Sequence, residues 1–308
     1  MYTIETIENK NTLLNQIIIT NKTLNFNCSI YPNLGASLQQ LKIGSLNLID
    51  GISCNENGLT TYKNAFKSSF LFPYPNRIEN GSYSFNGTGY KLFCNETALN
   101  NALHGHIHNK PFRITSKTFN EKEAKLTLSY SDNGITAGFP FPFNIDITYA
   151  ISATNIHITF NVLNSGTKAF PFGIGWHPYF NVEDLSNSIL NFEGISQYEL
   201  NSNMIPKKEQ NIKHSLPLKI ENTQLDDCYV LRNNRTTFNS KKYHLKIDFS
   251  ASKKNNFLQI YTPPNRKSIA IEPMTCAPNA FNNMDGLLTL NPSKSYQWEI
   301  NLQYNNKQ

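Results

Sequence analysis

The stretch IDITYAISATNIHITFNV, residues 145–162, decides the fold class. Its two halves alternate apolar and polar residues, and the residues SATN at 152–155 between them are typical of a turn. Alternation with a period of two places the apolar side chains of a strand on one face of a sheet. Residues 145–162 therefore predict a hairpin of two antiparallel strands.

Short alternating or apolar runs recur along the rest of the chain, at 15–20, 24–30, 35–48, 126–130, 243–249, 257–261 and 296–304. No stretch predicts a helix of more than about three turns, and no linker, low-complexity tract or fixed-period repeat divides the sequence. We therefore expect an all-β protein, a single domain over residues 1–308 built as an antiparallel β-sandwich. Two all-β domains are the alternative.

The composition indicates a large core and disfavours a nucleic-acid partner. The 308 residues are 39% hydrophobic, with a net charge of +6 and an isoelectric point near 8.9. The basic residues are scattered, and their densest clusters are the lysine pairs at 207–208, 241–242 and 253–254. Such pairs predict solvated faces rather than a basic stripe that binds nucleic acid.

The cysteines and the N-terminus indicate the compartment. The five cysteines have no CxxC spacing and an odd count, which disfavours disulfides and a cysteine zinc site: Cys28, Cys54, Cys94, Cys228 and Cys276. The first eight residues, MYTIETIE, lack the basic region of a signal peptide, and no stretch has the length of a membrane span. We expect a cytoplasmic protein with no membrane partner.

Residues 271–282, IEPMTCAPNAFN, contain a candidate general base. Glu272 follows the apolar run at 268–271 and precedes two prolines, which are expected to end regular structure. We therefore expect Glu272 at a strand end, held rigidly enough to accept a proton from a ligand. A solvated surface glutamate is the alternative.

Residues 72–87, FPYPNRIENGSYSFNG, predict a stiff polar loop. Its prolines fix the backbone before Asn76 and Arg77, whose side chains offer donors and an acceptor suited to a polyhydroxylated ligand. Arg77 could equally form an ion pair that fastens the loop.

Residues 101–110, NALHGHIHNK, contain three alternating histidines. In an extended strand His104, His106 and His108 would share one face, but the sequence places no further metal ligand nearby, and we expect no metal site. Gly105 would allow a ligand to approach closely, which favours a binding role for His104.

Residues 170–180, FPFGIGWHPYF, surround His177 with aromatic residues. Trp176, Tyr179 and Phe180 suit either a core or the apolar shelf on which a sugar ring stacks. In QLDDCY at 224–229, neighbouring strand residues face opposite ways, so only one of Asp226 and Asp227 can enter a cleft; either could also be a turn former.

Taken together and in order, these segments resemble the aldose 1-epimerase (galactose mutarotase) family. The matching motifs run from about residue 35 to the end: GASL at 35–38, PNRI at 75–78, GSYSFNG at 81–87, LHG at 103–105, HPYF at 177–180, LDD at 225–227, EPMT at 272–275 and PNAFN at 278–282. The resemblance implies a single-domain antiparallel super-sandwich that interconverts the α and β anomers of an aldose without a metal or another cofactor.

The resemblance also implies roles for individual residues. Glu272 would be the base that takes the proton of the anomeric hydroxyl, and His177 the acid that protonates the ring oxygen. His104 would bind the sugar near that oxygen. The hydroxyl-binding residues would be Asn76, Arg77, Tyr179 and Asp226, with Gln259 in LQIYT at 258–262 matching a family glutamine.

The flanks of His177 differ from the best-known galactose mutarotases, which have asparagine before this histidine and no proline after it. Here Trp176 and Pro178 stand there, which is similar to a broader group of aldose 1-epimerases. Ordinary pKa values of about 4.3 for glutamate and about 6.5 for histidine predict an ionised Glu272 and a partly protonated His177 at neutral pH.

Two alternatives stay open. A hexose-6-phosphate epimerase would share the chemistry but needs further cations to bind phosphate. A carbohydrate-binding or sensing protein would need no acid and base, so the presence of both Glu272 and His177 disfavours it. We expect a small-molecule sugar as partner, and either a monomer or a homodimer.

Overall fold

The computed structural model describes residues 1–250 and 256–307. Nearly all regular elements are strands: β1 Tyr2–Ile7, β2 Gln16–Asn21, β3 Phe26–Tyr31, β4 Ser37–Ile43, β5 Leu46–Asn47, β6 Phe70–Leu71, β7 Arg77–Ile78, β8 Ser82–Phe85, β9 Thr88–Lys91, β10 Ala102–Leu103, β11 Arg113–Phe119, β12 Ala124–Asn133, β13 Pro142–Ile151, β14 Asn155–Asn164, β15 Phe170–Phe172, β16 Gly175–Trp176, β17 Tyr179–Asn181, β18 Ile189–Leu200, β19 Pro206–Gln210, β20 Leu218–Lys219, β21 Asp226–Asn239, β22 Tyr243–Phe249, β23 Phe257–Tyr261, β24 Ser268–Met274, β25 Leu288–Leu290 and β26 Ser295–Asn306. The helices are α1 Glu56–Ala65 and α2 Ala280–Asn283, with 3-10 turns at Thr12–Leu14, Glu79–Gly81 and Leu185–Asn187.

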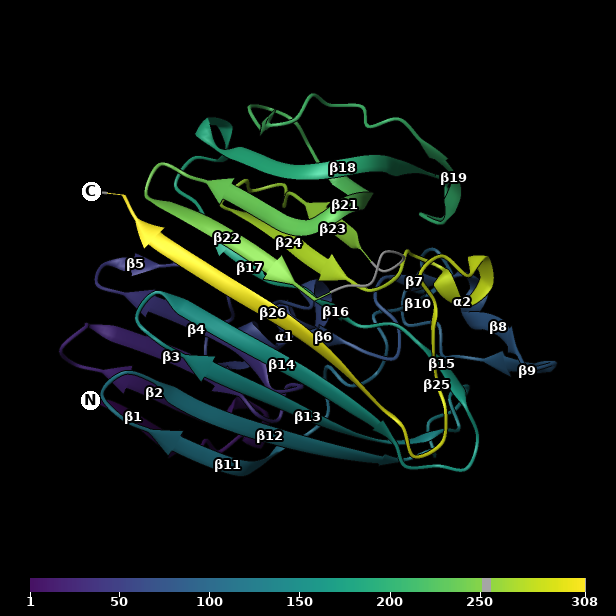
Figure 1. The fold of residues 1–308 in the computed structure, drawn as a ribbon, viewed down its shortest axis with the longest axis horizontal. Coiled ribbons are helices and arrows are strands. Elements are labelled where there is room, and N and C mark those ends of the chain that lie inside the picture. Colours follow the sequence, from purple (N-terminus) through teal and green to yellow (C-terminus); the bar gives the residue numbers. More distant parts are fainter. Residues whose placement is uncertain (251–255, 308) are drawn as a thin grey trace.

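The strands form two principal antiparallel sheets. A 15-stranded sheet runs in the order β11-β12-β13-β14-β26-β22-β21-β23-β24-β16-β6, with β17 to β20 attached to it, and β1 to β5 form a second sheet in chain order. Figure 1 shows β12, β13, β14, β26 and β22 side by side across the molecule. One hydrophobic core contains buried residues of both sheets. The structure confirms the predicted antiparallel β-sandwich class.

The hairpin predicted at 145–162 is confirmed. Strands β13 and β14 pair in continuous register from Phe143 opposite Asn164 to Ile151 opposite Ile156. One face of β13 is fully buried: Phe143, Ile145, Ile147, Tyr149 and Ile151. The Tyr149 hydroxyl donates to the Ala36 carbonyl oxygen, 2.6 Å away, beside the second sheet. The alternation therefore sets which face of the hairpin enters the core.

The other predicted strands are present with small shifts of boundary. Segments 243–249 and 257–261 coincide with β22 and β23, and 296–304 lies within β26. Helix α1 was not predicted. Asn55 caps its N-terminus, where the Asn55 side chain accepts a hydrogen bond from the Gly58 amide. The helix buries little besides Tyr62, so there is no strong apolar stripe by which its sequence could have been recognised.

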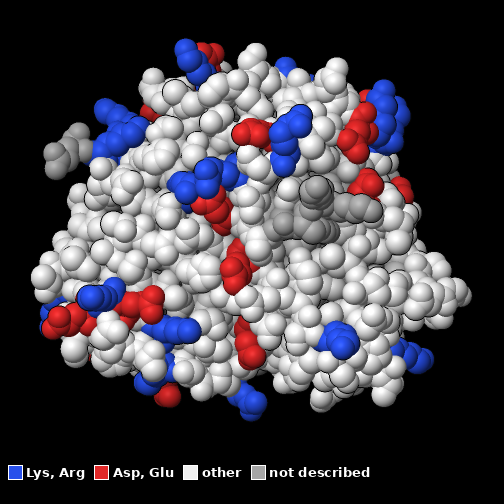
Figure 2. Space-filling model, in the orientation of Figure 1, with Lys and Arg blue, Asp and Glu red and all other residues white. Residues whose placement is uncertain are grey.

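Charged residues of both signs are mixed on the face seen in Figure 2. Lys207 and Lys208 both lie within 3.5 Å of Glu199, and Lys242 pairs with Glu183. The pair at 253–254 lies outside the described residues. The five cysteines are free thiols. Within the described part of the chain, no helix is long and apolar enough to cross a membrane.

Candidate active site

The centre of the site is a gap in the ladder between β24 and its neighbours β16 and β17. Tyr179 pairs with Ala270 and Gly175 pairs with Met274, in one common register. Continuing that register across the gap places His177 opposite Glu272. Two prolines, Pro178 and Pro273, remove the backbone donors that would otherwise close the ladder there.

Glu272 lies inside β24 rather than at a strand end, so the predicted strand end is wrong. Pro273 continues the strand and stays in register with Leu258 of β23. The amide of Ile271 donates to the Pro178 carbonyl oxygen and that of Thr275 to the Ile174 carbonyl oxygen, both on the side of β16 and β17. Alternation places the Pro273 nitrogen on that same side, at the gap, where its missing N–H costs no bond to β23.

The remaining polar groups reach the site because alternate residues of a strand face the same way. Gln259 of β23 is the cross-strand neighbour of Glu272, and Asp226 of β21 is opposite Tyr261. The side chain of Tyr179, two residues after His177, stacks on its ring with 5.0 Å between ring centroids and an interplanar angle of 11°. One face of β17, β21, β23 and β24 therefore forms the floor of the site.

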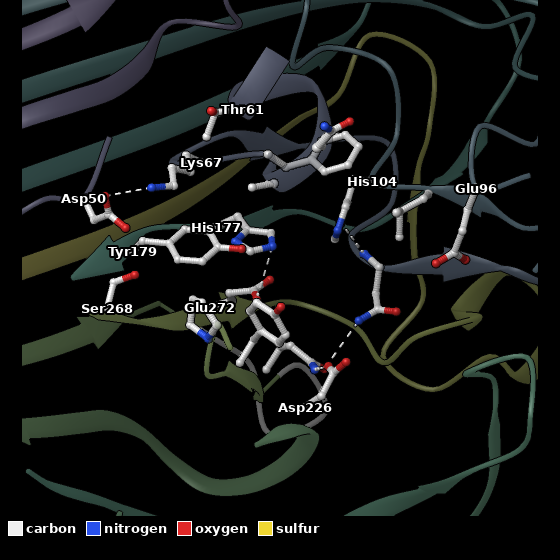
Figure 3. A pocket seen from close by; sticks show the side chains of 18 of the residues that line it. Asp50, Thr61, Lys67, Glu96, His104, His177, Tyr179, Asp226, Ser268 and Glu272 are labelled. Atoms are coloured by element: carbon white, nitrogen blue, oxygen red, sulfur yellow. Dashed lines mark hydrogen bonds and ion pairs between the residues drawn. The ribbon is translucent and has the colours of Figure 1, made fainter. Parts of the chain in front are cut away.

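A cavity of about 490 Å³ opens over this floor. All eight residues singled out from the sequence line it: Asn76, Arg77, His104, His177, Tyr179, Asp226, Gln259 and Glu272. Figure 3 shows His177 and Glu272 between Asp226 on one side and Asp50 with Lys67 on the other. The cavity thus brings together residues that are separated by up to 196 positions in the chain, from Asn76 to Glu272.

His177 and Glu272 form a buried imidazole–carboxylate pair. The Nε2 atom of His177 lies 3.4 Å from Oε1 of Glu272, and their side chains are 8% and 2% exposed. Burial, and next the nearby carboxylate of Asp226, raise the pKa of Glu272 well above its usual value. Burial lowers the pKa of His177 to about 3. The buried surroundings disfavour the charged form of each group, so the expectation of ordinary pKa values for Glu272 and His177 is wrong.

His104 faces the pair as a neutral hydrogen-bond donor. Its ring lies 5.2 Å from that of His177, centroid to centroid. The backbone amide of Asn76 donates to Nδ1 of His104, so we assign the ring hydrogen of the neutral form to Nε2. Burial lowers the pKa of His104 well below 6.5, which keeps the ring neutral at physiological pH.

The three histidines of the 101–110 segment do not lie along one strand, because β10 ends at Leu103. His104 and Gly105 both have positive φ, of 63° and 67°, and the chain turns there. A Cβ atom at Gly105 would lie 2.1 Å from the carbonyl oxygen of Phe72, so this glycine serves a backbone contact rather than the predicted approach of a ligand. His106 instead points toward Asp132, 3.9 Å away.

No group of three or more His, Cys, Asp or Glu side chains within residues 1–250 and 256–307 is placed to hold a metal ion.

Three polar side chains form a hydrogen-bonded row at the Asp226 end of the cavity. Asn76 Nδ2 donates to Gln259 Oε1 at 3.4 Å, and Gln259 Nε2 donates to Asp226 Oδ1 at 2.7 Å. Burial raises the pKa of Asp226 above its usual value. Asp227 faces away and accepts a hydrogen bond from Gln197, so only one carboxylate of the pair enters the cavity, as the strand geometry predicted.

Arg77 takes both roles considered for it, because it lines the cavity and also forms an ion pair. Its Nε and Nη2 atoms donate to the carboxylate of Glu96 at 2.8 to 3.2 Å, and Asn101 donates to the same carboxylate. Glu96 was not found from the sequence. It lies outside every predicted motif, and no local pattern marks it as the partner of an arginine 19 residues earlier.

Other lining residues also escaped sequence analysis, including Asp50, Phe66, Lys67, Tyr261 and Ser268. Tyr261 and Ser268 could have been found from the sequence, because alternate residues of a strand face the same way. Tyr261 is two residues from Gln259, and Ser268 is four residues from Glu272. For Asp50 and Lys67 no such signal existed, because they come from loops. Among the aromatics near His177, Trp176 and Phe180 are fully buried core residues, while Tyr179 lines the cavity.

Fold and site together define a class: a mostly β protein with antiparallel sheets and a buried carboxylate–imidazole pair in a polar cavity. The sequence matches the family model of aldose 1-epimerases over residues 16–303. The chain therefore belongs to the aldose 1-epimerase family.

Relatives and solved structures agree with this membership. The chain is 27% identical over 281 residues to the uncharacterized protein YihR of Escherichia coli, covering 87% of each. A galactose mutarotase-like protein from Clostridium acetobutylicum is similar with a TM-score of 0.85 at 19% identity, covering 100% of this chain and 99% of that one. For a galactose 1-epimerase from Lactobacillus acidophilus the TM-score is 0.76 at 16% identity, with the same coverage. These structural similarities show the galactose mutarotase-like fold.

Proposed function

We propose that this protein is an aldose 1-epimerase that interconverts the α and β anomers of an aldohexose. The observation that carries the proposal is the 3.4 Å contact between His177 Nε2 and Glu272 Oε1 on the floor of a polar cavity. Family membership supports the same reaction class. General acid–base chemistry requires two such groups within reach of one substrate.

In the proposed reaction Glu272 takes the proton of the anomeric hydroxyl while His177 gives a proton to the ring oxygen. The bond between C1 and the ring oxygen breaks, and C1 becomes a carbonyl carbon. After rotation about the C1–C2 bond, the ring oxygen attacks the other face of C1, and both protons return. Substrate and enzyme recover their protons, so the cycle balances without a further reactant.

The shifted pKa values fit a pair that shares one proton. Before ring opening His177 holds the proton of the pair; ring opening passes it to the ring oxygen, and Glu272 receives the proton of the anomeric hydroxyl in exchange. Burial favours the uncharged arrangement, which is the one that exists while the sugar is open. A sugar hydroxyl that donates to Glu272 stabilises the carboxylate, and so favours return of the proton to His177.

The charges of the cavity favour a neutral sugar over a hexose 6-phosphate. Among the described residues that line it, Lys67 and Arg77 are the cations, and both are paired with carboxylates at 2.7 and 2.8 Å. Asp226 and Glu272 add two further acidic groups. A phosphate would have to compete with Asp50 or Glu96 for its cation.

Polarimetry on freshly dissolved α-glucose and α-galactose tests the proposal. We expect the wild-type protein to speed the approach to the equilibrium rotation. Glu272→Gln and His177→Asn should each lose about 10² to 10⁴-fold of the rate, because each removes one positioned proton transfer. A binding protein would retain affinity for the sugar and leave the rotation curve unchanged. Equal rates in the wild type and both variants would refute the assignment.

A further inference from the structure

We propose that the ion pair of Lys67 and Asp50 is a second hydroxyl-binding subsite, which recognises two neighbouring hydroxyl groups of the sugar. The inference rests on the proposed function, since it concerns the same cavity. Lys67 and Asp50 lie at the end of the cavity away from Asp226, with His177 between the two ends (Figure 3). Neither belongs to the motifs that identified the site.

The segments that contain Lys67 and Asp50 are hydrogen-bonded to the backbone at and next to His177. The Ser68 amide donates to the His177 carbonyl oxygen at 2.8 Å, and the His177 amide donates to the Ser69 carbonyl oxygen at 3.0 Å. The Asp50 amide donates to the Tyr179 carbonyl oxygen at 2.8 Å. The ion pair is therefore held in a fixed position relative to the acid–base pair, as a specificity subsite requires.

The backbone around Lys67 is held in an unusual conformation. Phe66 and Ser68, on either side of it, both have left-handed φ angles, of 49° and 56°. Residues other than glycine rarely adopt such φ angles, because the Cβ atom crowds the backbone there. The Gln39 side chain donates to the Lys67 carbonyl oxygen at 2.7 Å, and the Ser69 hydroxyl donates to Tyr62 at 2.8 Å. These contacts fix a turn that directs Lys67 into the cavity.

The ion pair of Lys67 and Asp50 leaves a hydrogen-bond donor and an acceptor available to a ligand. Lys67 Nζ forms an ion pair with Asp50 Oδ1 at 2.7 Å and donates to the Gly51 carbonyl oxygen at 3.5 Å, so these contacts occupy at most two of its three hydrogens. Oδ2 of Asp50 has no hydrogen-bond partner among the described residues. A free donor thus lies beside a free acceptor, and two adjacent sugar hydroxyls can satisfy both, because each hydroxyl donates and accepts.

The surroundings favour a neutral hydroxyl over an anionic group. Asp50 balances the charge of Lys67, and the two side chains are only 25% and 14% exposed. The Lys67 ammonium also lies 5.6 Å from the centroid of the Tyr179 ring, which further satisfies its charge. An anion would have to displace Asp50 from this arrangement, whereas a hydroxyl pair extends it.

The alternative is that the ion pair only fastens the two loops together. The two readings differ in how they respond to a missing hydroxyl. A subsite loses discrimination between a sugar and its deoxy analogue when Lys67 or Asp50 is replaced, because the group that detects the hydroxyl is gone. A purely structural pair affects all sugars alike.

The experiment compares kcat/KM for glucose with that for its 2-, 3-, 4- and 6-deoxy analogues in the wild type, Lys67→Met and Asp50→Asn. We expect the wild type to disfavour at least one deoxy analogue by about 10-fold to 100-fold, the effect of a hydrogen bond to a charged group. Lys67→Met should remove most of that difference while it retains the discrimination at the other positions. Lys63→Met, an exposed lysine on α1, should match the wild type.

An equal loss for every sugar would overturn the subsite and leave only a structural pair. A wild-type preference for glucuronate or glucose 6-phosphate that Lys67→Met abolishes would overturn it in favour of an anion site. If the wild type accelerates no anomerisation, the proposed function fails instead. Titration calorimetry with the same sugars then still tests the subsite, which predicts weaker binding of glucose, but not of the critical deoxy analogue, to Lys67→Met.

Discussion

The hairpin β13–β14 and the interrupted ladder between β24 and β16–β17 are both antiparallel pairings in the same sheet. The first keeps nine consecutive residue pairs without a break and buries one face completely. The second holds one pair, then a gap at His177, and then three more pairs. The regular ladder provides stability, whereas the gap exposes two polar side chains to a cavity and to each other. Stability and the candidate chemistry are therefore assigned to different parts of one sheet.

The largest effect we expect is on the stability of the regular hairpin. Ile147, in the middle of β13, is fully buried and does not line the cavity. Ile147→Ala should lower the free energy of unfolding by about 2 to 5 kcal/mol, and Ile147→Val by about 0.5 to 1.5 kcal/mol. Urea unfolding measures both. A large fall in kcat of the still folded variants would show that hairpin and site are not separable.

A smaller effect is expected from the ion pair beside the gap. Glu96→Gln should raise KM about tenfold and change kcat less, because Arg77 loses the carboxylate fork that orients it, a charge-assisted contact worth on the order of 1.5 kcal/mol or more. Glu199→Gln is the matched control, since Glu199 does not line the cavity and pairs with the exposed Lys207 and Lys208. Steady-state kinetics on the preferred aldose provides the measurement, and an unchanged KM for Glu96→Gln would contradict this role.

The smallest effect we expect is on the free energy of unfolding after the substitution Glu272→Gln at the gap. This substitution should stabilise the protein, whereas those in the hairpin destabilise it. The pKa of Glu272 is raised in the folded protein. Glu272 therefore keeps its carboxyl proton to a higher pH in the folded state than in the unfolded state. The free energy of unfolding falls as the pH rises from about 4.5 through the pKa that Glu272 has in the folded protein. Glu272→Gln removes this cost, so we expect it to be more stable than the wild type at pH 7 and equal to it at pH 4.

Thermal unfolding at the two pH values measures the difference. A Glu272→Gln variant that is less stable than the wild type at pH 7 would show that the carboxylate stabilises the fold, contrary to its burial beside an imidazole that also resists charge.

The same contrast explains what sequence analysis could and could not predict. Alternation is a local property, so the hairpin at 145–162 and strands β22 and β23 followed directly from it. The eight proposed site residues came from motifs whose order in the chain is distinctive, and they line one cavity.

What the sequence could not supply depends on contacts between distant segments. Pro273 was expected to end β24, because nothing local reveals that its nitrogen faces a gap in the ladder. Asp50 reaches the cavity through an isolated bridge between Ile49 and Phe180, and Lys67 reaches it through a left-handed turn. The reversed pKa order of Glu272 and His177 arises from burial, which only the folded chain determines.

The most direct test of the account is magnetisation exchange between the α and β anomeric protons of an equilibrated aldose, measured by NMR with catalytic amounts of protein. The account predicts exchange peaks with the wild type and their loss with either Glu272→Gln or His177→Asn, at concentrations where the variants still bind the sugar. Exchange that persists undiminished in both variants, or is missing with the wild type for every aldose tried, would contradict it.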